Sequence, residues 1–328
     1  GASSDLPVLW VLQGRAGPRD RSRIVATPVR IALDAMGTDH APAAEVAGAI
    51  EALNELDPAI EVVLVGDQAI LEAALARHPE APAGRLHICH APDRVKASDP
   101  PASVIRRKPD SSIVVGLKLV KAGEADAFVS AGSTGAVMAT SLFTLRPLPG
   151  VARPAIGALL PTAQSPCLLI DAGANVDCKP HHLLQFAHLG HVYAQDLMGI
   201  ASPRVALLSI GEEPEKGDEL TLETHRLLKA APGLDFVGNV EGRDIIQGVC
   251  DVVVCDGFVG NVLLKFYESV AQFTIGLLKK ELKHSHEQLN LEEVFRILDY
   301  AEYGGAPLLG VGGVSIICHG ESSPRAIR

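Results

Sequence analysis

Short apolar runs rich in valine and isoleucine alternate with longer segments rich in alanine and leucine from Val29 onward, and this alternation constrains the fold most strongly. It is typical of βα units, in which helices connect parallel strands and pack against the sheet. Strands are predicted at residues 30–33, 61–65, 127–130, 167–171, 204–210, 235–237 and 252–255. Helical periodicity predicts helices at residues 43–56, 70–77, 112–122, 181–198, 219–230 and 262–282. The sequence therefore predicts a three-layer α/β/α sandwich around a mainly parallel sheet.

Composition supports this fold class and limits the partners. The chain of 328 residues is 47% hydrophobic but only 4% aromatic, so alanine, valine, leucine and isoleucine must build its core. The 39 acidic residues outnumber the 29 basic ones, and the net charge of −10 argues against nucleic acid as a partner. No apolar run approaches the roughly 20 residues that a membrane-spanning helix needs. We expect a cytoplasmic protein that is at most peripheral to a membrane.

The cysteines argue against a metal or redox site. The six residues stand singly at positions 89, 167, 178, 250, 255 and 318, several of them inside apolar runs. They lack the paired C-x-x-C spacing of zinc and redox sites. We interpret them as reduced thiols in the core of a cytosolic protein, and we expect no bound metal.

The chain offers few boundaries at which to divide it. Residues 1–28 mix proline, glycine and arginine around one short apolar patch, and we interpret them as an extension without a function. Residues 29–328 contain no long linker and are predicted to form a single α/β domain. A helical excursion from the sheet is predicted near residues 268–300. Its lysines, Lys279, Lys280 and Lys283, belong either to a solvated helix face or to a docking surface.

Asp34–Pro42 is the first of several polar turns that directly follow a predicted strand. In an open parallel sheet, ligands bind at the edge where the strands end. Asp34, Gly37 and His40 are therefore candidates for binding the substrate. The alternative is structural, because Asp39 can simply cap the following helix.

A second turn, Ser130–Ala136, follows an apolar strand and opens a helix of small residues. Backbone N–H groups and hydroxyls can face an anion at the positive end of such a helix. The candidate phosphate-binding residues are Gly132, Ser133, Thr134 and Gly135. The turn matches neither of the glycine-rich nucleotide-binding motifs, so an ordinary tight turn remains the alternative.

A third turn, Asp171–His182, places a lysine and histidines after an acidic segment that contains glycine. Asn175, Lys179 and His182 are its candidate site residues. A solvated charge at Lys179 and a histidine with an ordinary structural role at position 182 are the alternatives.

Two further strand ends, Gly238–Asp244 and Asp256–Val262, also carry glycine and asparagine. Their candidates are Asn239, Asp256, Gly257 and Asn261. Asparagine and glycine both tolerate a positive φ angle, so a purely conformational role stays open.

Taken in order, these segments resemble the bacterial phosphate acyltransferases, the PlsX family, from residue 30 to residue 320. The landmarks are Asp34–Pro42, Arg106–Lys108 before Ser111 and Ser112, Ser130–Ala136, Asp171–His182, Gly238–Asp244, Asp256–Val262, Tyr303–Ala306, and His319 with Gly320. The chain departs from the usual pattern at Thr38, Ser133, His181 and Glu302. The helical excursion also looks reduced, and the sequence stops at Arg328, short of the closing helix that the family usually carries.

The resemblance implies a fold like that of isocitrate and isopropylmalate dehydrogenases and a reaction without a cofactor. Inorganic phosphate would attack the thioester of a fatty acyl group on acyl carrier protein, giving acyl phosphate for phosphatidic acid synthesis and free carrier. Our hypothesis gives Lys179 the role of fixing phosphate or stabilising negative charge, with Asn239 and Asn261 as hydrogen-bond donors. His182 is the candidate acid–base group.

The resemblance also implies partners. Acyl carrier protein is acidic, so it needs a basic patch on an acidic enzyme. Arg106, Arg107 and Lys108 form one candidate patch, and Lys279, Lys280 and Lys283 form another. A homodimer and a peripheral membrane association through the helical excursion are further expectations.

Other functions compete with this interpretation. An acyltransferase similar to phosphotransacetylase would use coenzyme A instead of the carrier. A decarboxylating dehydrogenase of related fold would need a nucleotide-binding fingerprint, for which Gly310–Gly313 is a poor substitute. A protein that binds a phosphorylated ligand or a carrier without turnover would keep the same turns.

Overall fold

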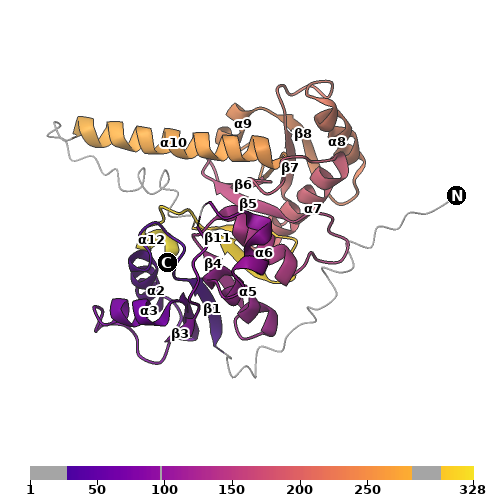
Figure 1. Cartoon of the computed structure of the whole chain (residues 1–328). Coiled ribbons are helices and arrows are strands. Elements are labelled where there is room, and N and C mark those ends of the chain that lie inside the picture. Colours follow the sequence, from indigo (N-terminus) through magenta and orange to yellow (C-terminus); the bar gives the residue numbers. More distant parts are fainter. Residues whose placement is uncertain (1–27, 97, 283–303) are drawn as a thin grey trace, which may run out of the picture. The chain divides into compact units, whose positions relative to one another are not determined.

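The computed structural model describes residues 28–96, 98–282 and 304–328, except for the side chains of residues 279, 281 and 282 (Figure 1). The described chain forms two compact units. Unit 1 contains the described residues up to Pro154 together with Gly310–Arg328, and unit 2 is Ala155–Leu309. The predicted extension lies outside the described residues apart from Pro28. The expectation of a single domain over residues 29–328 stays a prediction.

Unit 1 contains five strands that pair in parallel. In sheet order they are β3 (Leu86–His90), β2 (Ile60–Gly66), β1 (Val29–Asp34), β4 (Ala127–Ser130) and β11 (Val314–Ile317). The helices are α2 (Ala43–Glu55), α3 (Gln68–Leu75), α4 (Val104–Arg107), α5 (Ser112–Ala122), α6 (Thr134–Thr144) and α12 (Pro324–Ile327), with a 3₁₀ turn at Pro101–Ser103. Because all five strands are parallel, their carboxyl ends lie at one edge of the sheet.

The sequence of α2 explains its place in unit 1. Val46, Ile50 and Leu53 recur at helical spacing and are buried together with Leu33 and Leu64 of the neighbouring strands. Such a stripe gives the helix one apolar face, which packs on the sheet and keeps the polar face in solvent. The packing holds the N-terminal end of α2 next to the turn that follows β1.

Unit 2 has a mixed sheet. Its strands in sheet order are β10 (Ala306–Leu309), β5 (Ala155–Leu160), β6 (Cys167–Ile170), β9 (Val252–Val254), β7 (Arg204–Leu208) and β8 (Asp235–Val240). β5 is antiparallel to both β10 and β6, and the pairs from β6 to β8 are parallel. The helices are α7 (Pro180–Asp196), α8 (Glu219–Ala230), α9 (Gly242–Gln247) and α10 (Gly257–Leu282).

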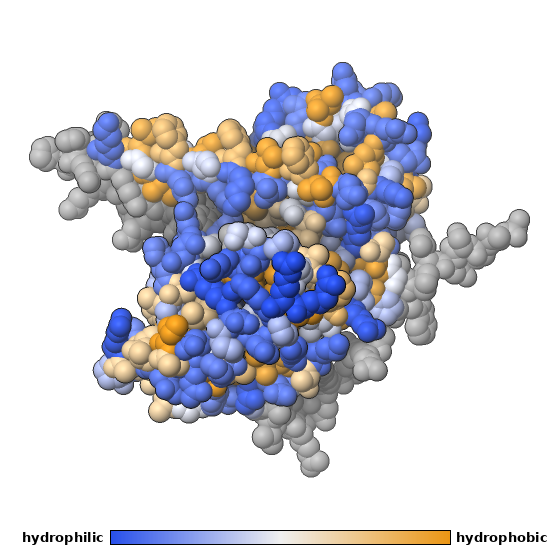
Figure 2. Space-filling model, viewed as in Figure 1, coloured by the Kyte–Doolittle hydropathy of each residue, from blue (hydrophilic) through white to orange (hydrophobic). Residues whose placement is uncertain are grey.

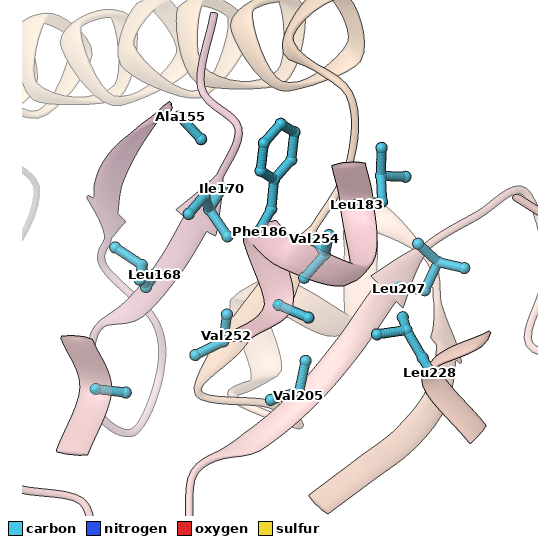
Figure 3. Packing of buried hydrophobic residues seen from close by; sticks show 12 residues of the cluster. Ala155, Leu168, Ile170, Leu183, Phe186, Val205, Leu207, Leu228, Val252 and Val254 are labelled. Atoms are coloured by element: carbon cyan, nitrogen blue, oxygen red, sulfur yellow. The ribbon is translucent and has the colours of Figure 1, made fainter. Parts of the chain in front are cut away.

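The core of unit 2 lies between the parallel strands and α7 (Figure 3). Phe186 and Leu183 of α7 are buried against Ile170 and Val254, which belong to the neighbouring strands β6 and β9. The nearly uninterrupted apolar character of these strands reflects burial on both faces, as is usual in parallel sheets. This packing holds the N-terminal end of α7, with Lys179 and His182, at the carboxyl edge of the sheet.

The prediction of an α/β fold with a mainly parallel sheet is confirmed. The structure adds β3, β5, β10 and β11, which the sequence analysis does not predict. It also ends β7 at Leu208, two residues earlier than expected, and begins α10 at Gly257. α10 reaches Leu282, whereas residues 283–303 of the predicted excursion lie outside the described part of the chain.

Candidate functional site

Asp171, directly after β6, organises the most tightly connected turn of unit 2. Its buried carboxylate accepts hydrogen bonds from the backbone N–H groups of Ile156 (3.0 Å), Gly173 (3.2 Å), Ala174 (2.9 Å) and Asn175 (2.7 Å). The Asn175 amide donates a fifth, at 2.9 Å. Burial raises the pKa of Asp171, and these hydrogen bonds oppose that rise. The carboxylate thus fixes the backbone of the whole turn.

The first turn of α10 is attached to the turn of Asp171. The Gly257 N–H donates to the Asn175 carbonyl at 2.7 Å. A Cβ atom on Gly257 would lie 2.7 Å from the Asn175 nitrogen, so only glycine allows this approach. Asn261 is exposed one turn further along, and a Cβ on Gly173 would lie 3.4 Å from its Oδ1. The structure therefore brings Asn175, Gly257 and Asn261 together.

The side chain of Asp256 caps the N-terminal end of α10. Its Oδ1 accepts hydrogen bonds from the N–H groups of Phe258 (2.8 Å) and Val259 (3.1 Å). A carboxylate at this position satisfies the first N–H groups of the helix and interacts favourably with its positive end. The observed contacts of Asp256 and Gly257 are thus made within the protein, and their predicted role in substrate binding stays a prediction.

Lys179 and His182 begin α7. Lys179 is exposed, and its backbone N–H donates to Nδ1 of the buried His182 at 3.0 Å. A backbone N–H can only donate, so Nδ1 is unprotonated and the neutral ring carries its proton on Nε2. The ring of His181 contacts that of His182 edge-on, with centroids 4.2 Å apart. His182 thus has a fixed orientation and tautomer.

Asn239 lies elsewhere along the same edge of unit 2. Its backbone is in register with Leu207, Val254 and Ile170 across three strand pairs, which corresponds to about 14 Å between β8 and β6. Lys179 and Asn261 flank the turn after β6, whereas Asn239 lies on the far side of β7. The sequence predicts that Lys179, Asn239 and Asn261 lie at one edge of the sheet, but it does not predict the distance between Asn239 and the other two.

Both polar atoms of the Asn239 side-chain amide form hydrogen bonds. Its Nδ2 donates to the Glu213 carbonyl at 2.9 Å, and its Oδ1 lies 2.8 Å from Nδ1 of His225 on α8. Because the carbonyl can only accept, Oδ1 must face His225, whose Nδ1 carries a proton. Both side chains are buried, with 6% of Asn239 and 7% of His225 exposed. His225 is a residue that sequence reasoning misses, since it lies on a helix 14 positions away.

In unit 1, Asp34 connects the turns after β1 and β4. Its buried carboxylate accepts hydrogen bonds from the Met36 N–H (3.1 Å) and the Ser130 hydroxyl (2.6 Å). The Gly132 N–H donates in turn to Ser130 Oγ at 3.0 Å. Burial raises the pKa of Asp34, and the hydrogen bond from Ser130 is the largest opposing effect. The predicted residues Asp34 and Gly132 are therefore brought together.

Gly37 and the N-terminal end of α6 belong to the same arrangement. A Cβ atom on Gly37 would lie 2.8 Å from the Gly132 nitrogen, so the two turns touch through their backbones. Ser133 is the N-cap residue of α6, and its side chain makes no capping hydrogen bond. Ser133 and Gly135 are half-buried, and Thr134 is exposed. The predicted cradle thus presents hydroxyls and backbone N–H groups together at one helix end.

His40 lines a surface pocket of about 460 Å³ in unit 1. Its other lining residues are Ala43, Ala44, Glu321, Ser322, Ser323 and Pro324. The turn beneath it is anchored by Glu45, which accepts the Thr38 N–H at 2.7 Å, and by Arg94, which donates to the Thr38 carbonyl at 2.7 Å. Thr38, one of the departures from the family pattern, is completely buried.

The two predicted basic patches differ in what the structure describes. Arg106 and Arg107 are exposed on α4, but Lys108 forms an ion pair with Asp99 at 2.6 Å and also donates to the Arg94 carbonyl at 2.7 Å. Of the second patch, Lys280 is exposed, whereas the Lys279 side chain and all of Lys283 lie outside the described residues.

The described residues contain no group of three or more His, Cys, Asp or Glu side chains that could hold a metal ion. Their helices include none whose length and apolar character would let it cross a membrane.

The sequence of the chain is similar to that of a known protein family. A family model described as "fatty acid synthesis protein" matches residues 29–328. The phosphate acyltransferase of Desulforamulus reducens is 51% identical over 307 residues, covering 92% of this chain and 91% of the relative. That of Heliobacterium modesticaldum is 53% identical over 308 residues, with the same two coverages.

Solved structures show the same fold in more distant proteins. The phosphotransacetylase EutD of Staphylococcus aureus has a TM-score of 0.61 at 17% identity, covering 92% of this chain and 91% of its own. A phosphotransacetylase of Streptococcus pyogenes has a TM-score of 0.64 at 15% identity, covering 93% and 92%. At such identities the likeness concerns the fold alone. Sequence identity near 50% over nearly the whole length is decisive, and the chain belongs to the phosphate acyltransferase family.

Proposed function

We propose that the protein transfers the acyl group of an acyl carrier protein thioester to inorganic phosphate. A phosphate oxygen attacks the carbonyl carbon, the carbon–sulfur bond breaks, and the products are acyl phosphate and the free carrier thiol. Acyl phosphate then feeds phosphatidic acid synthesis. The observation that carries the proposal is the near 50% identity to phosphate acyltransferases over 92% of the chain.

The turn after β6 supports the catalytic roles in this proposal. Attack requires the phosphate oxygen to lie about 3–3.5 Å from the carbonyl carbon, with donors for the developing oxyanion. Lys179 is an exposed cation beside a turn fixed by Asp171, and Asn261 is exposed against the same turn. We assign the stabilisation of negative charge to Lys179, hydrogen-bond donation to Asn261, and proton transfer to His182. We assign no donor role to Asn239, because its amide is buried and already donates to the Glu213 carbonyl.

The charge of the N-cap residues favours phosphate binding at the N-terminal end of α6. Of the helices in unit 2, α7 has as its N-cap residue Lys179, to which the stabilisation of negative charge is assigned, whereas Asp218 and Asp256 place a carboxylate at the ends of α8 and α10. A second anion there would meet a like charge. Ser133 of α6 in unit 1 leaves its helix end without a side-chain cap. We therefore propose the turn Gly132–Gly135 as the phosphate cradle.

The test of the function compares two thioesters. Purified enzyme is incubated with phosphate and either palmitoyl carrier protein or palmitoyl coenzyme A, and the release of free thiol is followed. We expect phosphate-dependent release from the carrier, and its loss in Lys179→Ala with the fold intact. Near-normal turnover of Lys179→Ala would remove this residue from the mechanism.

Two other outcomes would favour other functions. Release from coenzyme A alone would favour an enzyme like phosphotransacetylase, the class to which the two structural neighbours belong. Binding of the carrier without any release would favour a non-catalytic binder.

Carrier docking is proposed at Arg106 and Arg107, which remain exposed while Lys108 is paired with Asp99. Exposed charges of this kind act mainly on the association rate and are screened by salt. Arg106→Glu with Arg107→Glu should raise KM for the acyl carrier protein and leave the reaction with small thioesters unchanged. A rate that is insensitive to salt in the unaltered enzyme would count against this surface.

A homodimer is proposed through α10, which exposes an apolar stripe (Figure 2). The stripe consists of Val262, Phe266, Val270, Phe273 and Leu277, which recur three or four residues apart. Exposed contiguous apolar faces of this kind commonly mark an interface. Phe273→Glu should convert a dimer into a monomer when mass is measured by light scattering, whereas an unchanged mass would exclude this face.

Peripheral association with the inner membrane face is the remaining proposal for a protein of the cytoplasm. It concerns the predicted excursion at residues 268–300, much of which lies outside the described residues. Co-sedimentation with vesicles of phosphatidylglycerol tests it. Recovery of the protein in the supernatant would remove membrane association from the account.

A further inference from the structure

Three large apolar side chains are exposed on the segments that follow consecutive parallel strands of unit 2. Val176 follows β6 and is 68% exposed, Phe258 follows β9 and is 63% exposed, and Ile210 follows β7 and is 80% exposed. Isolated exposed apolar residues are ordinary on a protein surface. Three of them on adjacent strand ends, at the edge where ligands bind in such sheets, are not scattered at random.

A hydrogen bond brings the segments of Val176 and Phe258 together, and the strand order puts Ile210 on the segment after the neighbouring strand. Asn175 and Gly257, the residues just before Val176 and Phe258, are joined by a backbone hydrogen bond of 2.7 Å. Leu207 of β7 is in register with Val254 of β9, so Ile210 lies just beyond the end of the strand next to the one that leads into Phe258. We call Val176, Ile210 and Phe258 the apolar rim.

Two of the three residues of the apolar rim, Val176 and Phe258, stand on backbone that is fixed by hydrogen bonds. The turn that carries Val176 is fixed by the five hydrogen bonds to Asp171, and the one that carries Phe258 is fixed by the cap from Asp256. Side chains held out from such a backbone lose little further freedom when a ligand covers them, which favours binding. The exposed position of these side chains is therefore a fixed feature of the backbone that carries them.

The carboxyl ends of the strands in unit 1 carry no comparable apolar side chains among the described residues. Among the described residues of unit 1, the exposed large hydrophobic side chains are Val29, Leu56, Ile70, Phe143 and Val314. None of them lies on the turns that follow β1, β4 and β11. Those turns instead present the polar groups of Ser133, Thr134 and His40. Among these strand ends, those of unit 2 therefore offer an apolar ligand the exposed apolar side chains that favour its binding.

We propose that the acyl chain of the thioester lies against the apolar rim, with its carbonyl at the turn of Asp171 and its methylene groups over Val176, Ile210 and Phe258. This inference rests on the proposed function, because only that reaction brings a long acyl chain to this edge. It deepens the function by giving unit 2 the recognition of chain length. A second copy of the protein and the surface of the carrier are the other possible occupants, and they enter as outcomes of the test.

The test compares chain lengths. The variants Val176→Ser, Ile210→Ser and Phe258→Ser are assayed with palmitoyl and butyryl carrier protein under phosphate saturation. Removal of one apolar contact should lower kcat/KM for the palmitoyl thioester roughly 10-fold and leave that for the butyryl thioester within about twofold. Leu197→Ser is the matched control, since Leu197 is similarly exposed, at 71%, but follows the C-terminal end of α7, the opposite end of that helix from Lys179. This control should not change the ratio of the two substrates.

Several results would overturn the inference. Equal losses for both chain lengths would mean that the rim serves catalysis, the carrier or the fold. No loss for either thioester would mean that the acyl chain lies elsewhere. A change from dimer to monomer without chain-length selectivity would assign the rim to a second copy.

Failure of the proposed function is distinguishable from these results. It would appear as an unaltered enzyme that turns over neither thioester. In that case, calorimetric titration with both acyl carrier proteins still tests the apolar rim. Weaker binding of the palmitoyl form alone in the three variants would support it, and unchanged binding would contradict it.

Discussion

Asp34 in unit 1 and Asp171 in unit 2 are both buried aspartates at the carboxyl end of a strand, but they are compensated differently. Asp171 receives four backbone N–H groups and one amide, whereas the observed donors to Asp34 include one backbone N–H and the Ser130 hydroxyl. A carboxylate surrounded by fixed N–H groups makes its turn rigid. The carboxylate of Asp34, bonded to the Ser130 hydroxyl, instead links the turns after β1 and β4 through side chains. Unit 2 thus presents a preformed edge with apolar side chains, and unit 1 a polar edge.

The largest expected effect comes from replacing each aspartate with asparagine. In Asp171→Asn, one carboxylate oxygen becomes an NH₂ group that faces the N–H donors of Asn175, so buried donors lose their acceptor. We expect a loss of about 3–5 kcal/mol in the free energy of unfolding. Asp34→Asn can donate to Ser130 Oγ and still accept from Met36, so about 1–2 kcal/mol is expected. Urea unfolding measures the free energy of both variants. Equal losses would contradict the difference that we infer between Asp171 and Asp34.

The second prediction concerns the uncapped helix of unit 1. Ser133→Asp places a carboxylate where we propose that the phosphate binds, and it should raise KM for phosphate roughly 10- to 100-fold through like-charge repulsion. The same change should leave stability equal or higher, because aspartate is a good N-cap residue. Asp256→Asn is the matched change in unit 2 and should leave KM for phosphate within about threefold. A reversed pattern would move the phosphate to unit 2.

The third prediction concerns how His225 holds Asn239. His225→Leu leaves the Asn239 oxygen without its donor in a buried place and should lower stability by about 1–3 kcal/mol. His225→Gln can still donate and should recover at least half of that loss. In the double variant with Asn239→Ala, the losses should fall short of their sum, because both remove the same hydrogen bond. Additive losses in urea unfolding would show that His225 acts independently of Asn239.

The smallest expected effect is on the dependence of stability on pH. Burial raises the pKa of both Asp34 and Asp171 above 3.8. The stability that each contributes is therefore full below pH 3.8 and is lost as pH rises through the folded pKa. The difference in unfolding free energy between the unaltered protein and each asparagine variant should shrink with rising pH, by at most about 1.4 kcal/mol per pH unit.

Asp251 provides the control of opposite sign. Burial raises the pKa of Asp251, but hydrogen bonds and charge from Arg204 outweigh burial and hold it below 3.8. Its contribution is present above pH 3.8 and is lost as pH falls through the folded pKa. Unfolding of Asp251→Asn across acidic pH should show the loss growing with pH. The same slope for Asp171→Asn and Asp251→Asn would contradict the assigned causes.

Much of the fold can be predicted from the sequence, because burial leaves a strong pattern. β6 and β9 read as continuous apolar runs, and α2 carries a clear apolar stripe. The missed strands lack such patterns: β10 contains Pro307, and β3 alternates around two histidines. Antiparallel pairing of β5 likewise leaves no trace in a pattern that otherwise suggests βα units.

The position of the polar turns can be predicted from the sequence, but their contacts cannot. Turns rich in glycine, aspartate and asparagine follow strands that the structure contains, and they include Asp34, Asn175 and Asn261. The hydrogen bonds of Asp171 to backbone N–H groups have no signature in sequence, because every residue type supplies such groups. The pairing of Lys108 with Asp99 and of Asn239 with His225 depends on tertiary packing, which a linear pattern does not encode.

The central claim is that this enzyme forms acyl phosphate, and ³¹P NMR of its reaction tests that claim most directly. With palmitoyl carrier protein and inorganic phosphate, we expect a new phosphorus resonance of an acyl phosphate, in equal amount to the free carrier thiol. Thiol released without that resonance would indicate hydrolysis by water. Such a result, or the absence of both products, would rule out the proposed reaction.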